Sequence, residues 1–531
     1  MSKEDQGKDS RYTEHSANRR LTKPAPPQPS APSTLATTMP AKSTSTDEVR
    51  VRIAPSPTGQ LHLGTARTAL YNYLYAKRHK GKFIIRLEDT DEERSEEHYV
   101  EDIIAGLKWL GFTWDEGPDI GGPYPPYRQT QKVDHYSNIA NQLIAKEAAY
   151  LAYETPEELS ALKEEQKAKG EPPRYDNRGR DLGQSQIDHY LKEGRIPSLR
   201  FIIEEPRTVT WQDHIRGSMA IETIDLGGDL VIVKSSGIAT YNFAVVVDDL
   251  DMKISHVIRG EDHLHNTAKQ ILIYEALGSS KPEFAHVALI FDHEHRKMSK
   301  RVHGAAAHID YYREQGYMPE AIVNYLAQMS FTPADGREIF TLEEGGEVFD
   351  LARVSKSPAI FDLQRLNWFN SHYLRSLPIE LITERALPYL TSIDHSDYTD
   401  KQLQEVIGSV RDGLTTLSQI LAATKFYFVK TPEISEELKS TVLTQESARK
   451  IMKQTLQELD KFPFGDQKGC KQIIDNMGKE LNVKGKDLYW PLRAALSGAV
   501  QGPDLGSIIS ALGAKRIKTR LESALSNGSN S

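Results

Sequence analysis

Cysteine is almost absent from this chain of 531 residues, and long apolar runs are missing altogether. Cys470 stands alone, so the chain forms no disulfide of its own, which fits a reducing compartment. No run approaches the roughly 18 apolar residues that cross a bilayer, and residues 1–48 lack the apolar segment of a secretory signal. These absences predict a cytoplasmic protein with no membrane partner.

A strong net charge is also lacking. The 66 Lys and Arg against 74 Asp and Glu give a net charge of −8 at pH 7. Such a chain does not coat nucleic acid through bulk charge, but it can still bind through local basic patches, because salt screens exposed charges beyond about 10 Å. The length predicts about three or four domains.

Composition and periodicity divide the chain into five segments. Residues 1–48 are rich in Ser, Thr and Pro and nearly free of aromatics, which predicts a disordered tail. We expect the first half of an α/β domain at 49–131, an α+β insertion at 132–241, the second half of the α/β domain at 242–375 and an all-helical region at 376–531. A transit peptide for a plastid or mitochondrion is the alternative for the tail, but its acidic start disfavours that alternative.

The segment after the tail has the pattern of a βαβ unit. VRVRIA alternates like a strand, APSPTG is a loop, and apolar residues recur at helical spacing from Ala66 to Leu74. Gly81 and a second strand-like run, KFIIRLED, follow. In a parallel sheet this unit places the first loop and the helix N-terminus at the carboxyl edge, where ligands bind. The pattern predicts a Rossmann-like domain.

Later runs extend this prediction. In the insertion, a charged helix, TPEELSALKEEQKAKG, precedes the short strands SLRFIIEE, TVTWQDHIRG and DLVIVKS. Beyond it, YNFAVVVDD from Tyr241 and ISHVIRGED from Ile254 predict buried strands that return to the parallel sheet, and NTAKQILIYEALG predicts a helix.

The stretch SPTGQLHLGTARTALYNYL contains a candidate phosphate site. A helix N-terminus offers unpaired N–H groups and about half a positive charge. Gly64 lets the backbone approach a phosphate closely, and His62 can donate a hydrogen bond to it. Thr65 stands where the better-known His-x-Gly-His signature has its second histidine, and we expect its hydroxyl to cap the helix. Taken alone, the stretch is more often an ordinary turn.

A second basic motif, KMSKR, follows the strand-like run HVALIFD. Its lysines, Lys297 and Lys300, are compact charges that can follow phosphate charge as it moves during phosphoryl or nucleotidyl transfer. Alone this motif is more often a solvated loop, but the two motifs in this order are specific as a pair.

With this pair the chain resembles class I aminoacyl-tRNA synthetases, and among them the bacterial-type glutamyl-tRNA synthetases. The resemblance runs from about Val49 to Leu525 and is also carried by RIAPSPTG, RLEDTDEERS, PPRYDNR, VIRGED, DGREIFTLEE, FDLQRLNWFN and PLRAALSG. In this group the first signature commonly reads His-x-Gly-Thr, so Thr65 fits the family. The resemblance implies ligation of L-glutamate to tRNA(Glu) through glutamyl-adenylate, with ATP as substrate, Mg2+ present, and transfer to the 2′-hydroxyl of the terminal adenosine.

Glutamate carries two carboxylates and an ammonium group, so its pocket needs fixed cations and at least one anion. The resemblance implies that Arg52 and Arg259 contact the side-chain carboxylate and that Glu88 holds the amino group. It implies further lining by Ala54, Ser56, Tyr241 and Val245, ATP contacts at His62, Gly64, Asp262, Ile290 and Lys300, and a catalytic set of His62, Gly64, Thr65, Lys297, Ser299 and Lys300.

A metal site is not expected. Some relatives carry a zinc knuckle in the inserted domain, but the matching positions here hold Ala152, Glu154, Gly179 and Asp181. Such a zinc site needs about four thiolate or imidazole ligands, so we predict no zinc. His293-Glu294-His295 is interpreted as a polar loop leading into KMSKR.

Contacts to tRNA are expected from basic residues in two regions. The candidates are Arg174, Arg178 and Arg180 in the insertion and Arg493, Lys515, Arg516, Lys518 and Arg520 near the C-terminus. Members that charge only tRNA(Glu) can carry an arginine where Gly413 falls, and that arginine helps to reject the Gln anticodon. We therefore hypothesise a non-discriminating enzyme, a monomer, that also charges tRNA(Gln).

Two alternatives remain. Glutaminyl-tRNA synthetases usually read PPEPNG where this chain has APSPTG. A catalytically inactive tRNA-binding or regulatory paralogue would be expected to lose some of the motif residues, yet the chain keeps His62, Gly64, Lys297 and Lys300.

Overall fold

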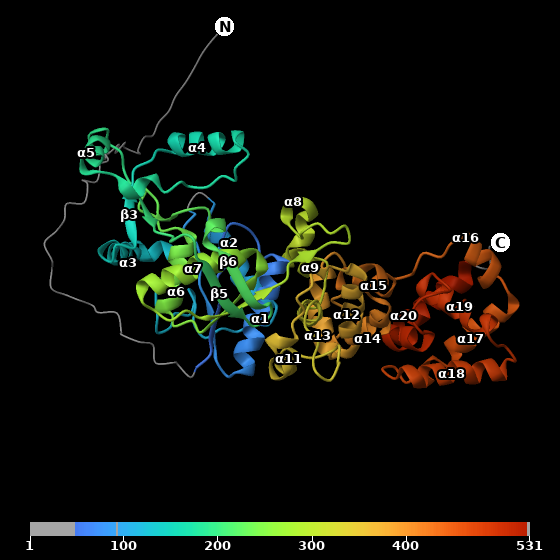
Figure 1. The fold of residues 1–531 in the computed structure, drawn as a ribbon. Helices are drawn as coiled ribbons and strands as arrows, with labels where there is room; N and C mark the ends of the chain where they lie inside the picture. The colour runs from blue at the N-terminus through green and yellow to red at the C-terminus, as the bar shows by residue number, and fades with distance from the viewer. Residues whose placement is uncertain (1–47, 92–93, 528–531) are drawn as a thin grey trace, which may run out of the picture. The chain divides into compact units, whose positions relative to one another are not determined.

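The computed structural model describes residues 48–91 and 94–527 (Figure 1). The predicted disordered tail lies outside the described residues except for Glu48. Within the described part of the chain, no helix is both long and apolar enough to cross a membrane.

The predicted βαβ unit is present. Strand β1 (Arg50–Ile53) pairs in parallel with β2 (Lys82–Ile85), and helix α1 (Leu63–Arg78) connects them. Helix α1 buries most of its side chains because its apolar residues recur at helical spacing. A Cβ at Gly81 would lie 2.1 Å from the carbonyl oxygen of Val49, so only glycine fits between the helix and β2. Helix α2 (Glu97–Trp109) follows.

A second sheet carries the rest of the catalytic core, in the order β6-β5-β9-β8. Strands β8 (His256–Gly260) and β9 (Glu283–Val287) are parallel, and β8 adjoins β1 where Ser255 N–H donates to the Arg50 carbonyl. The hairpin of β5 (Thr208–Asp213) and β6 (Gly217–Glu222) joins this sheet because β5 pairs in parallel with β9. Two strands of the expected insertion therefore extend the catalytic sheet.

The run YNFAVVVDD was predicted as a strand, and this is wrong: it forms helix α6 (Tyr241–Asp251), which packs beside α7 (Leu264–Leu277) (Figure 1). Residues 242–249 are all buried, so the helix shows no amphipathic pattern. Valine-rich runs favour strands, and periodicity cannot separate a short buried strand from a buried helix. Here packing against neighbouring elements on every side favours the helix over the strand.

The insertion has α+β character, as predicted. Its antiparallel sheet has the order β3-β4-β7, formed by β3 (Ala149–Ala152), β4 (Ser198–Phe201) and β7 (Leu230–Val233). Its helices are α3 (Val133–Ala145), α4 (Pro156–Ala168) and α5 (Gln184–Lys192). Thr155 and Glu158 form a capping box that starts α4.

The chain then becomes helical. Short elements lead away from the core: β10 (Ile290–Phe291), α8 (Lys300–His303), α9 (Ile309–Glu314), α10 (Pro319–Gln328), α11 (Leu342–Val348), β11 (Ala359–Ile360) and α12 (Leu363–Ser376). From there to Asn527 the described residues form no strand. The helices are α13 (Ile379–Ala386), α14 (Asp400–Val410), α15 (Ile420–Phe428), α16 (Glu436–Leu438), α17 (Glu446–Gln457), α18 (Gln467–Glu480), α19 (Lys486–Ser497) and α20 (Leu505–Asn527).

Candidate active site

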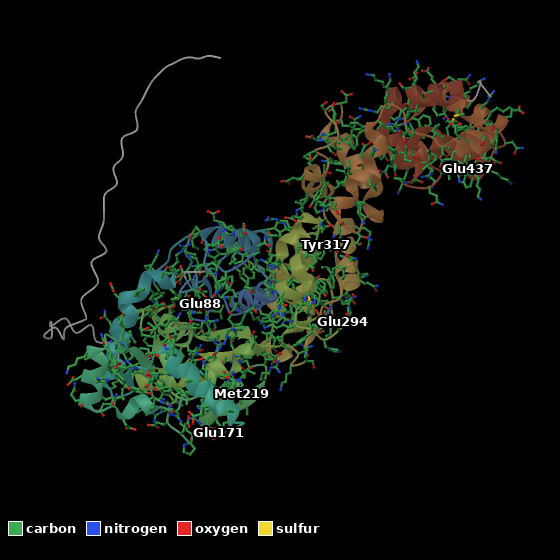
Figure 2. All side chains as sticks on the ribbon, turned by 90° about the horizontal axis from the view of Figure 1, so that it is seen from above. Glu88, Glu171, Met219, Glu294, Tyr317 and Glu437 are labelled. Carbon is green, nitrogen blue, oxygen red and sulfur yellow. The ribbon has the colours of Figure 1, made fainter. Side chains whose placement is uncertain are left out.

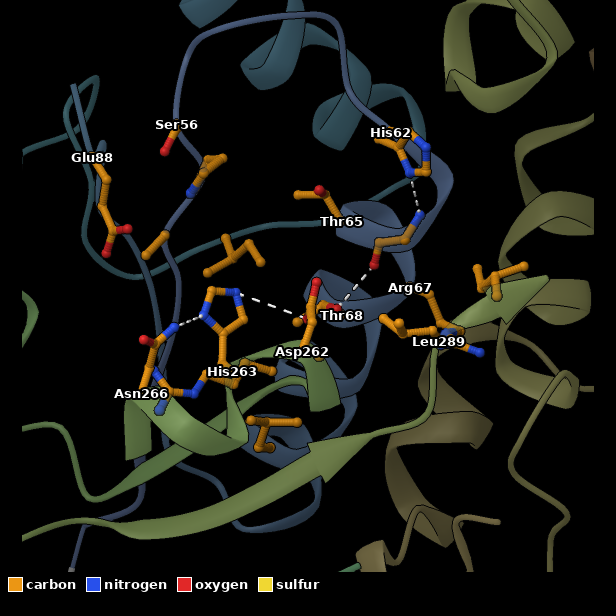
Figure 3. A pocket seen from close by; sticks show the side chains of 18 of the residues that line it. Ser56, His62, Thr65, Arg67, Thr68, Glu88, Asp262, His263, Asn266 and Leu289 are labelled. Carbon is orange, nitrogen blue, oxygen red and sulfur yellow. Dashed lines mark hydrogen bonds and ion pairs between the residues drawn. The ribbon is translucent and has the colours of Figure 1, made fainter. Parts of the chain in front are cut away.

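A cavity of about 490 Å³ opens at the carboxyl ends of β1 and β8 and at the N-terminus of α1 (Figure 3). The structure brings together most residues that the sequence singled out: Arg52, Ala54, Ser56, His62, Gly64, Thr65, Glu88, Tyr241, Arg259, Asp262, Ile290 and Lys297 all line it. Val245, Ser299 and Lys300 do not. Val245 was expected on a strand that lines the cavity, but it lies on helix α6 and its side chain is buried away from the cavity.

His62, not Thr65, caps helix α1. Its Nδ1 accepts the N–H of Gly64 at 3.0 Å, whereas Thr65 is already the third helical residue. The prediction of a threonine cap is therefore wrong, because the helix begins three residues earlier than a cap at Thr65 would require. Since Nδ1 accepts, the neutral ring carries its proton on Nε2. Burial lowers the pKa of His62 to about 4, so the ring is neutral at pH 7.

Arg259 brings a positive charge to the floor of the cavity. Its guanidinium is buried and donates to Thr267 Oγ1 at 2.6 Å, to Gln270 Oε1 at 2.9 Å and to His286 Nε2 at 3.3 Å. These acceptors are all neutral, and no carboxylate of the described residues lies within ion-pair distance. Burial accordingly lowers the pKa of Arg259. A buried cation without an anion is costly, so this site favours an anionic ligand.

Arg52 differs from Arg259 because it already has an anionic partner. Its Nε lies 3.1 Å from Asp249 Oδ1, and Asp249 also receives Arg86 Nη1 at 2.6 Å. Arg86 in turn donates to Glu88 at 3.1 Å. Burial raises the pKa of Glu88, and the neighbouring arginines oppose that rise. The side chain of Glu88, which is labelled in Figure 2, is buried.

Sequence reasoning missed the two residues that link this network, Arg86 and Asp249. Arg86 had a signal, since in RLED it stands two positions before Glu88 and so shares its side of an extended chain. Asp249 had a weaker signal, because it is an acidic residue within an apolar run that is expected to be buried. The wrong assignment of that run as a strand gave no correct position for its side chain.

Lys297 and Asp262, which both line the cavity, form an ion pair with Nζ and Oδ2 2.9 Å apart. Burial would raise the pKa of Asp262, but Lys297 and His263 bring it below its usual value. The backbone of Lys297 pairs in antiparallel fashion with Phe291, and Met298 N–H donates to Ile290 O. The start of KMSKR is therefore held against the short strand β10. Lys300 is exposed and starts α8 outside the cavity, so its ATP contact stays a prediction.

His263 and Asn266 also line the cavity and were not predicted (Figure 3). His263 Nδ1 lies 3.1 Å from the Tyr241 hydroxyl and 3.2 Å from Asn266 Nδ2. Burial lowers the pKa of His263 to about 4. The signal available in the sequence was the position of His263 directly after VIRGED, at a strand end.

The positions that match the zinc knuckle of some relatives take part in hydrogen bonds. Tyr175 donates from its hydroxyl to Glu154 Oε1 at 2.8 Å and accepts the Gly179 N–H at 3.0 Å. The three arginines expected to meet the acceptor end of tRNA are each paired within the insertion: Arg174 with Glu205, Arg178 with Asp176 and Arg180 with Asp229.

Arg520 was expected to contact tRNA, and this is wrong. Its side chain is buried, and its guanidinium donates to the carbonyl groups of Leu496, Phe426, Tyr427 and Val429. It therefore ties α20 to α15 and α19. Its neighbours Lys515 and Lys518 are exposed.

Two family models match the chain. Residues 48–368 match tRNA synthetases class I (E and Q), catalytic domain, and residues 381–525 match an anticodon binding domain. Glutamate–tRNA ligase of Carboxydothermus hydrogenoformans is 46% identical over 478 residues, which cover 89% of this chain and 99% of the relative. Glutamate–tRNA ligase of Desulforamulus reducens is 45% identical over 482 residues, which cover 90% and 99%.

A solved structure is also similar. It is a crystal structure of a glutamate tRNA ligase from Elizabethkingia meningosepticum in complex with its amino acid. The match has a TM-score of 0.80 and 34% sequence identity, and it covers 90% of this chain and 99% of that chain.

Proposed function

Because the chain belongs to the class I tRNA synthetases of the glutamate and glutamine group, we propose that it ligates L-glutamate to tRNA(Glu) with ATP as the second substrate. In the first step an α-carboxylate oxygen of glutamate bonds to the α-phosphorus of ATP, and the bond from that phosphorus to pyrophosphate breaks. In the second step the 2′-hydroxyl of the terminal adenosine takes the glutamyl group, and AMP leaves.

Arg259 is the observation that carries this proposal. It is a buried cation with only neutral partners among the described residues, and the side-chain carboxylate of glutamate supplies the missing anion. A glutamine side chain has no charge and would leave the cation unpaired, so Arg259 favours glutamate over glutamine. Glu88 at the same end of the cavity can hold the ammonium group.

The other end of the cavity suits ATP. The N-terminus of α1 and the Nε2–H of His62 offer donors to phosphate oxygens, and Lys297 can exchange Asp262 for a phosphate. Mg2+ is usually held by one or two carboxylates together with substrate phosphates, and Asp262 provides one carboxylate here. The ion would neutralise phosphate charge.

Kinetics of Arg259 variants test the glutamate site. Arg259→Gln should raise the KM for glutamate at least about 30-fold, because a charge-assisted hydrogen bond contributes roughly 2 kcal/mol. Arg259→Lys should recover part of the loss, since it restores the charge without the planar fork. The measurement is aminoacylation of tRNA(Glu) at varied glutamate concentration, with thermal unfolding to verify the fold.

Arg207→Gln is the control, because Arg207 forms an exposed pair with Glu275 away from the cavity. An unchanged KM for glutamate in Arg259→Gln would contradict the proposed function.

Finer features belong to the same proposal. The absence of an arginine at Gly413 supports charging of tRNA(Gln) as well as tRNA(Glu). Monomeric state and a cytoplasmic location complete the proposal.

A further inference from the structure

We propose that His214, His256 and Glu283 form a binding site for a divalent transition-metal ion of the zinc type. Their ligand atoms all lie within 4.8 Å of one another. His256 and Glu283 are the first residues of β8 and β9, whereas the catalytic cavity lies at the carboxyl end of β8. The site is therefore separate from the catalytic cavity.

The backbone of the sheet fixes the three positions. His256 and Glu283 are partners in the parallel register of β8 and β9. Glu283 N–H donates to Ser255 O at 2.8 Å, and His214 N–H donates to Phe284 O at 2.9 Å. Ligands on paired strands lose little freedom when they bind an ion, so the site is preorganised.

One pair of ligand atoms, His256 Nε2 and Glu283 Oε2, has the spacing of a metal site, whereas His214 Nε2 contacts Glu283 Oε2 directly and has to move away from it to admit an ion. Two ligands of a tetrahedral zinc ion, each about 2.0–2.1 Å from the metal, lie about 3.4 Å apart. His256 Nε2 lies 3.5 Å from Glu283 Oε2, and His214 Nε2 contacts the same oxygen. His214 and Glu283 are partly exposed, at 39% and 61%, so an ion and a water ligand can enter from solvent.

The contacts of His256 Nδ1 allow a ligand tautomer. Ser255 Oγ lies 2.9 Å from His256 Nδ1 and 3.1 Å from Arg50 O. In the tautomer in which the serine proton goes to Arg50 O, Nδ1–H donates to Ser255 and the lone pair of Nε2 faces the carboxylate of Glu283. In that tautomer a positive ion between Nε2 and the carboxylate removes the repulsion between two facing acceptors.

A plain ion pair is the competing explanation. A protonated His214 beside Glu283 would satisfy those two side chains, but in the His256 tautomer that donates to Ser255 it leaves His256 Nε2 facing an acceptor. Two imidazoles and one carboxylate suit Zn2+, and an open fourth position is common for such sets. A bound ion would join the end of β5 to β8 and β9. The sequence-based expectation of no metal considered other positions and stays a prediction.

Zinc binding to the full-length, untagged chain tests the proposal. Wild type should bind one Zn2+, measured by competition with a chromophoric chelator. His214→Ala and Glu283→Gln should each weaken binding at least about tenfold, since even outer-shell partners contribute 10–100-fold. Both side chains are exposed enough for the variants to fold. Zn2+ should also slow hydrogen exchange at the start of β9 in wild type alone.

His189→Ala is the matched control, because it removes a histidine from an exposed histidine–glutamate pair, with Glu193, on α5. It should bind Zn2+ as wild type does. The proposal is overturned if wild type binds no Zn2+, or if it binds one ion that neither His214→Ala nor Glu283→Gln weakens.

Discussion

His62 uses its two ring nitrogens for different purposes. Nδ1 accepts the Gly64 N–H and starts α1, which leaves the proton on Nε2 for a phosphate oxygen. Because burial lowers the pKa of His62 to about 4, the ring is neutral at pH 7, so in the proposed ATP site the positive charge would come from the helix N-terminus and Lys297.

The two roles of His62 can be separated by substitution. His62→Ala removes the cap, worth about 1 kcal/mol, and should speed hydrogen exchange in the first turn of α1 about fivefold. His62→Asn should keep normal exchange, because asparagine is a good cap. Both variants should lose about 100-fold in glutamyl-adenylate formation, measured by pyrophosphate exchange, since neither places a donor where Nε2 lies.

His98→Ala, which alters an exposed histidine, is the control for His62. Full activity in His62→Asn would show that capping alone explains the residue.

Single residues were predictable where a motif marked them, and less so where three-dimensional packing assigned their partners. His62, Arg259 and Lys297 belong to motifs and reach the cavity as expected. The ion pair of Arg52 with Asp249 joins segments far apart in the chain, so no local pattern reveals it. Arg520 shows the converse, because a basic helical pattern does not tell a buried arginine from an exposed one.

At the scale of elements, local periodicity predicted most strands and helices, and it failed at α6. That run is buried on all sides, so the choice between helix and strand depended on neighbours rather than on its own pattern. The joining of β5 to β9 was also beyond prediction, because strand pairing between distant segments leaves no local signal.

The insertion should depend on one buried carboxylate, that of Asp229. It accepts from Arg180 Nε at 2.6 Å, from the Tyr150 hydroxyl at 2.7 Å and from Ile203 N–H at 2.8 Å. Asp229→Asn keeps the volume but turns one acceptor into a donor, which should destabilise this region by about 2 kcal/mol. Hydrogen exchange should accelerate in β3, β4 and β7 but not in β8.

The exposed residue Asp225 lies nearby, so Asp225→Asn serves as the control and should leave exchange unchanged. Equal acceleration in β8 and in the insertion would contradict a local role for Asp229.

At the scale of the whole molecule, the sequence predicted the order of an α/β core, an α+β insertion and a helical region, because each has its own composition and period. The chemistry belongs to the first of these, whereas the anticodon binding match falls in the helical region. Selection of the tRNA and selection of the amino acid can therefore be altered separately.

Gly413 provides the test of this separation. Gly413 is exposed and is the last residue of a short turn after α14. An added Cβ would meet no heavy atom within 4 Å, so an arginine fits there without strain. If the missing arginine is what admits tRNA(Gln), Gly413→Arg should lower kcat/KM for tRNA(Gln) at least about tenfold, a loss of about 1.4 kcal/mol. Charging of tRNA(Glu) should stay within about twofold, because the glutamate and ATP sites are untouched.

Gly413→Ala separates the effect of the guanidinium from that of any side chain and should behave as wild type. Negligible charging of tRNA(Gln) by wild type, or an equal loss on both tRNAs in Gly413→Arg, would refute non-discriminating recognition through this position.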